Sequence, residues 1–101
     1  MQIDPEKFGE FFERVADRSQ EMVRRREDEA TEFRKEVEGE AVATEIVDDI
    51  IERAKVVAAK YDDAVATRET DGNKAIDLWR EAEAECKEIE DELRKIKRHF
   101  E

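Results

Sequence analysis

Residues 70–100 read TDGNKAIDLWREAEAECKEIEDELRKIKRHF, and this stretch decides the fold class. After its first four residues, apolar and small side chains recur at steps that alternate between four and three. That spacing places them on one face of an α-helix for nearly four heptads. They are Ala75, Trp79, Ala82, Cys86, Ile89, Leu93, Ile96 and Phe100. Because the letters TDGN favour a tight turn, we predict a helix over about 74–100 that follows a turn at 70–73.

The segment upstream of this turn predicts a second helix over about 44–69. Its apolar face is unusually wide, which is typical of a helix that is packed from more than one side. Thr44 is the best candidate for its N-cap. The seam of the face consists of Ala43, Val47, Ile50, Ala54, Val57, Tyr61 and Ala64. We expect this helix to be the central one.

The N-terminal segment predicts another long helix, over about 5–38. Asp4 suits the N-cap and Pro5 the first helical position. Apolar residues then recur at helical spacing from Phe8 to Val37, and nothing stops the pattern before Gly39.

Two all-α architectures follow from the region around Gly39. In the favoured one the chain turns there, and the three helices form an antiparallel bundle that dimerisation would complete. In the alternative, one long helix over 5–69 and the helix 74–100 build an intertwined dimer. The alternative stays open because the heptad register of the second helix extends back through Gly39 without a slip, and a lone glycine costs a helix only about 1 kcal/mol.

Composition limits the possible functions. The 101 residues include 30 acids and 19 bases, for a net charge of −11, and the length suits a single domain, 1–101. Strong acidity makes nucleic acid an unfavourable partner. No apolar run approaches the ~20 residues that span a bilayer, so we expect no membrane partner and a cytoplasmic location. With Ser19 and His99 as the only serine and histidine, we predict no catalytic site.

Two acidic motifs flank Gly39: Asp28–Glu32 has the form acid-Glu-x-x-Glu, and Glu45–Asp48 has the form Glu-x-x-Asp. Acids three residues apart share a helix face, so a turn at Gly39 would bring the two motifs towards each other. Carboxylate oxygens in that number suit Mg²⁺. The candidate metal ligands are Glu29, Glu32, Glu45 and Asp48.

This pattern resembles the metal-binding signature of the all-α nucleotide pyrophosphohydrolases, the MazG-like and dUTPase-like group. The resemblance covers about twenty residues, with Asp28 where the family has glutamate. It implies a Mg²⁺-dependent enzyme that cleaves nucleoside triphosphates and uses the acidic residues between 28 and 49. This is the alternative to the function that we favour.

The favoured function is protein–protein interaction without catalysis and without a cofactor, beginning with self-association into a dimer. Three thin helices leave parts of their apolar stripes exposed, and a second copy or another protein would cover them. A variant of this hypothesis is an acidic decoy for a basic partner. The candidate interface residues are Phe8, Phe12, Trp79, Ile89, Leu93, Ile96 and Phe100.

Two single residues carry separate expectations. Arg26 falls on the apolar seam, so we predict that it pairs with a glutamate across a helix interface. Cys86 lies on the seam of the last helix and is expected to be a buried, unreactive thiol. The basic residues near the end of that helix, from Arg94 to Arg98, are interpreted as complementing its dipole.

Overall fold

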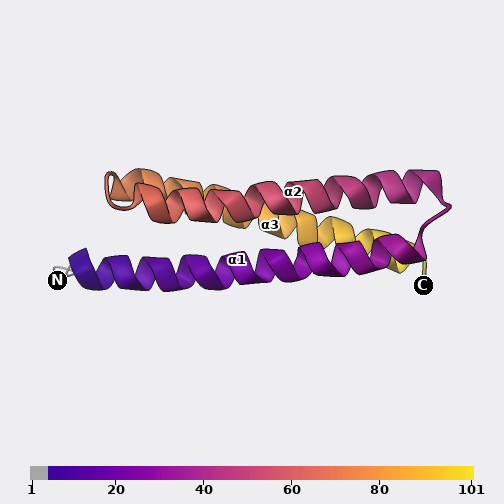
Figure 1. Ribbon diagram of the computed structural model, residues 1–101, viewed down its shortest axis with the longest axis horizontal. Helices are drawn as coiled ribbons and strands as arrows, with labels where there is room; N and C mark the ends of the chain where they lie inside the picture. The colour runs from indigo at the N-terminus through magenta and orange to yellow at the C-terminus, as the bar shows by residue number, and fades with distance from the viewer. Residues whose placement is uncertain (1–4) are drawn as a thin grey trace.

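The computed structural model describes residues 5–101, with side chains from Lys7 onward, and this part of the chain is an all-α three-helix bundle (Figure 1). Helix α1 spans Pro5–Glu36, α2 spans Ala41–Thr67 and α3 spans Gly72–His99. The helices run up, down and up in a rod of 55 × 20 × 16 Å. The predicted fold class is confirmed, whereas the predicted N-cap Asp4 lies outside the described residues. Within residues 5–101, no helix combines the length and apolar character needed to cross a bilayer.

The chain reverses at Gly39, as the favoured architecture predicted, so the alternative of a single helix over 5–69 is wrong. Gly39 has a φ of +102°, in the region that L side chains rarely adopt and glycine adopts freely. The amide of Glu40 donates to the carbonyl of Val37 at 2.9 Å and closes the turn. Glycine therefore acts as a helix terminator rather than as a tolerated helix residue.

The second turn falls where it was predicted, but α3 begins at Gly72, inside the predicted turn at 70–73, and α2 also begins earlier than predicted. Asp71 caps α3 by accepting a hydrogen bond from the Lys74 amide at 3.1 Å. Helix α2 begins at Ala41 after Glu40, whose side chain makes no capping hydrogen bond. Thr44, the predicted N-cap, lies inside the helix and donates its hydroxyl to the carbonyl of Val37 at 3.1 Å. It ties the start of α2 to the end of α1.

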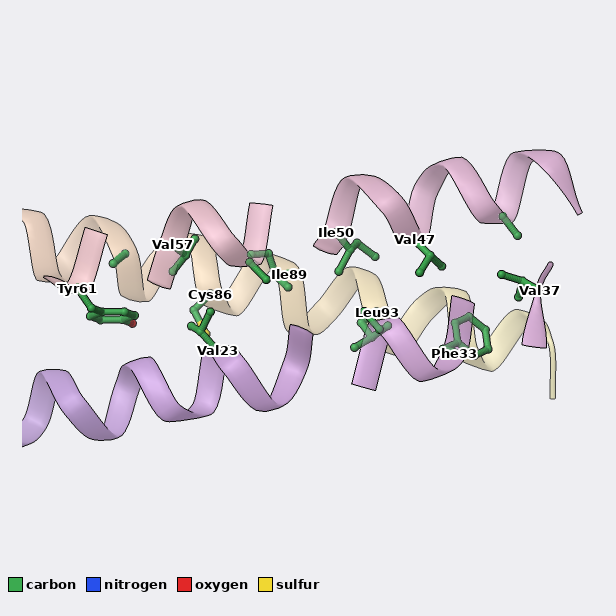
Figure 2. Close-up of a cluster of buried hydrophobic side chains, with 14 of the residues drawn as sticks. Val23, Phe33, Val37, Val47, Ile50, Val57, Tyr61, Cys86, Ile89 and Leu93 are labelled. Carbon is green, nitrogen blue, oxygen red and sulfur yellow. The ribbon is translucent and has the colours of Figure 1, made fainter. Parts of the chain in front are cut away.

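Helix α2 is the central helix, as its wide apolar face predicted. Its buried residues are the predicted seam, from Ala43 to Ala64. Helices α1 and α3 both pack along α2, and they contact each other far less. Figure 2 shows the shared core, in which Val23 of α1, Ile50 of α2 and Leu93 of α3 point inward. In Figure 1, α3 starts beside α2 and ends beside the C-terminal end of α1.

One of the two rows of the apolar seam shifts by one residue at the Gly39 turn, although the sequence register predicted no slip. The row of Phe12, Phe33 and Val47 keeps separations that are multiples of seven through the turn, whereas the other row ends at Val37 in α1 and resumes at Ala43 in α2, six residues on where an unbroken row needs seven. Carrying the α2 register backward places Met22 in the core, yet Val23 takes that place and Met22 is 48% exposed. Once the chain reverses, each helix can rotate about its own axis to bury its best face.

Candidate functional site

The four predicted metal ligands do not come together. Glu29 faces α3, where its carboxylate accepts hydrogen bonds of 2.6 Å from Lys97 and 2.6 Å from Arg26. Asp48 instead faces Arg34 of α1, which donates to both of its oxygens at 2.5 and 3.4 Å. The two acids that were expected to converge thus point to different sides of the bundle, each towards a cation.

The other two acids are also apart. Glu32 is exposed and pairs within α1 with Lys35 at 3.4 Å. Glu45 lies on the far side of α2, next to Ile96 and His99 of α3. Among the described residues there is no group of three or more acidic, histidine or cysteine side chains able to hold a metal ion.

A network of four charges connects the C-terminal halves of α1 and α3. Glu29 binds both Arg26 and Lys97, and Arg26 also approaches Glu90 of α3 at 3.6 Å. The hydrogen bond from Lys97 lowers the pKa of Glu29, and Arg26 adds to this effect. The predicted cross-helix pairing of Arg26 is therefore confirmed, although the side chain stays 36% exposed.

The sequence did not identify Lys97 as a member of this network, because its place near the end of α3 suggested only dipole complementation. The position of Lys97 around the helix is the signal that could have identified it. Since Glu90 and Lys97 are seven residues apart, they lie on the same face of α3. An anion that entered this region would meet cations already paired with Glu29 and Glu90.

The predicted interface residues divide into a buried set and a surface set. Phe12, Ile89 and Leu93 belong to the core of the single chain and are closed to a partner. Phe8, Trp79 and Ile96 are half-buried at the edge of that core, and Phe100 is 45% exposed. Phe8 packs on Phe12 with ring centroids 6.2 Å apart, and Phe100 meets Phe33 edge to face at 6.1 Å.

An uncovered row of apolar side chains follows the first half of α1. We call it the α1 stripe and define it as Phe8, Phe11, Val15 and Met22. Phe11 is 63% exposed and Met22 is 48% exposed, while the other two are half-buried. The sequence contains the pairs Phe11–Phe12 and Met22–Val23, and one member of each pair must leave the core because neighbouring residues lie about 100° apart on a helix.

The row of residues that carries the α1 stripe continues along α1 as far as Glu29. Residues 8, 15, 22 and 29 are separated by seven and lie in one row. Glu29, the last of them, contacts Lys97 of α3. Helix α3 therefore covers this row at its C-terminal end, through charges, and leaves its apolar N-terminal part exposed.

Two hollows lie along the junction of α2 and α3, and together we call them the α2/α3 groove. Val56, Val57 and Ile89 line one hollow, and Ile46 and Ile96 line the other. The ion pairs of Arg53 with Asp49 and Glu92 cross between the two hollows. Val57 and Ile89 are almost fully buried, so the exposed apolar lining is Ile46 and Val56 with the half-buried Ile96. The charged lining of the groove consists of Glu45, Asp49, Arg53, Glu85, Glu88, Glu92, Lys95 and His99.

The two buried reactive groups face carboxylates. Tyr61 donates its hydroxyl to Glu83 at 2.5 Å, and burial raises the pKa of Tyr61. Cys86 is buried, and burial followed by the charges of Glu90 and Glu83 raises its pKa to about 11. A thiol in this environment is protonated and unreactive near neutral pH, as the sequence predicted.

Comparisons of the chain with protein-family models, with curated proteins and with solved structures find no match.

Proposed function

We propose that this chain functions as a protein-interaction module and that its first partner is a second copy of itself. One observation carries the proposal: large apolar side chains remain exposed on the surface of the bundle, and most of them lie along α1 or along the junction of α2 and α3. Among the described residues they are Phe11, Met22, Val42, Ile46, Val56 and Phe100. Two belong to the α1 stripe and two to the α2/α3 groove, and Val42 lies one helical turn before Ile46.

This exposure supports a binding role because apolar surface gains free energy when a partner removes it from water. Covering the exposed parts of Phe11 and Met22 would contribute on the order of 1–2 kcal/mol each. A fourth helix laid along the α1 stripe would turn this region of three thin helices into a four-helix arrangement.

Sedimentation velocity at tens of micromolar tests the proposal. The unmodified chain should sediment as a dimer or larger species, and Phe11→Glu combined with Met22→Glu should sediment as a monomer. The matched control is Thr31→Glu combined with Ala84→Glu, which adds the same charge at exposed positions outside both surfaces. An unmodified chain that is monomeric, or a stripe variant that associates like the control, would contradict the proposal.

A further inference from the structure

We infer that the α1 stripe of one copy docks in the α2/α3 groove of the next, so that the copies associate head to tail. This inference rests on the proposed self-association and adds which surface meets which. It follows from three properties of the two surfaces: their apolar content, their length and their opposite charge.

The α1 stripe has a basic border. Lys7, Arg14, Arg18 and Arg25 are all exposed, and their separations of seven, four and seven residues place them in one row on α1. Around the helix, this row lies next to the stripe on the side away from the buried seam. Arg25 pairs with Glu21 at 2.8 Å, whereas the other three have no ion-pair partner among the described side chains.

The α2/α3 groove has an acidic border. Five carboxylates line it, against the cations Arg53 and Lys95. Arg53 is already neutralised, because it pairs with Asp49 at 3.1 Å and with Glu92. Glu45 and Glu88 have no cationic partner within the described part of the chain, and Lys95 has no acidic partner there. The groove therefore offers two free carboxylates against one free cation.

The two surfaces also agree in length. The stripe runs from Phe8 to Met22, and the α3 side of the groove runs from Glu85 to His99. Both intervals are fourteen residues, about 21 Å of helix.

Charge distinguishes this contact from the simplest alternative, a stripe packed on a stripe. A two-fold contact brings the same patch of both copies together, and with the two α1 helices antiparallel it would place two basic rows side by side. Like charges in that arrangement repel. Docking in the groove places the basic row against free carboxylates, which favours association and fixes its orientation.

The test uses two variants that each disable one surface. The stripe variant is Phe11→Glu with Met22→Glu, and the groove variant is Ile46→Arg with Val56→Arg, all at exposed positions. Matched controls place glutamate or arginine at both Thr31 and Ala84. Circular dichroism and thermal melting of each variant, compared with those of the unmodified chain, check that the variant keeps the bundle.

Head-to-tail docking predicts that each variant alone is monomeric, while an equimolar mixture of the two gives a one-to-one pair in sedimentation velocity. The intact stripe of the groove variant then occupies the intact groove of the stripe variant. A groove variant that associates like the unmodified chain would overturn the inference and leave self-association standing. A mixture that stays monomeric would also overturn it, whereas a monomeric unmodified chain would remove the proposed function itself.

Discussion

Replacing Gly39 with alanine should destabilise the bundle, because alanine has to adopt the φ of +102° that the turn requires. A Cβ at this position meets nothing within 4 Å, so the cost is conformational and not steric. Holding an L residue in the left-handed region costs about 1–2 kcal/mol. For a domain of this size, the melting temperature should fall by roughly 5–15 °C.

Gly72→Ala is the matched control for this substitution. Gly72 is the first residue of α3, has no positive φ, and also has nothing within 4 Å of an added Cβ. Alanine there should leave stability unchanged or raise it by up to about 1 kcal/mol, because alanine loses less backbone entropy than glycine on folding.

The assay is urea unfolding followed by circular dichroism, at a protein concentration low enough to keep the chain monomeric. Gly39→Ala should have a lower midpoint at an unchanged slope, and Gly72→Ala a midpoint at least as high as that of the unmodified chain. If Gly39→Ala is as stable as the unmodified chain, the reversal at Gly39 does not depend on glycine. The reasoning that rejects the long helix over 5–69 then fails.

Three further predictions concern side-chain chemistry. The folded pKa of Glu29 lies below its ordinary value, so the stability from its contacts with Lys97 and Arg26 is present above the ordinary carboxyl pKa and is lost as pH falls through the folded pKa. Glu29→Gln should therefore flatten the decline of the urea midpoint below about pH 5, and an unchanged decline would contradict the assignment. Cys86, with its pKa raised to about 11, should react with a thiol-specific disulfide reagent at pH 8 only as fast as the bundle unfolds, and rapid reaction of the folded protein would show an exposed thiolate. Calorimetric titration with millimolar Mg²⁺ should give no binding heat, because Glu29 and Asp48 face different cations; saturable binding would restore the pyrophosphohydrolase hypothesis.

The helices themselves were predictable because each carries its signal locally. The alternating steps of four and three mark α3 without reference to the rest of the chain, although its Asp71 cap was not among the predictions. The wide face of α2 correctly indicated a helix packed on two sides. Helical periodicity depends on residues that are close to one another in the chain, so it can be recognised directly from the sequence.

The site was less predictable because it depends on helix rotation, which is set by packing. Whether Met22 or Val23 faces the core is a choice between adjacent apolar residues, and contact with α2 decides it in favour of Val23. The same rotation turns Glu29 towards Lys97 and away from Asp48, so the two acidic motifs separate although the chain turns at Gly39 as expected.

Some of the predicted interface residues lie in the core of the single chain for a related reason. Ile89 and Leu93 have the spacing of a dimer seam, but that spacing also suits a core within one chain, and α2 occupies it. The exposed members of apolar pairs, such as Phe11, were the better signal.

The most direct test of the central claim is the molar mass of the unmodified chain in solution, measured by sedimentation equilibrium across the micromolar range. Self-association predicts a mass that rises with concentration towards a multiple of the 11.9 kDa monomer. A constant mass of 11.9 kDa up to tens of micromolar would contradict the account.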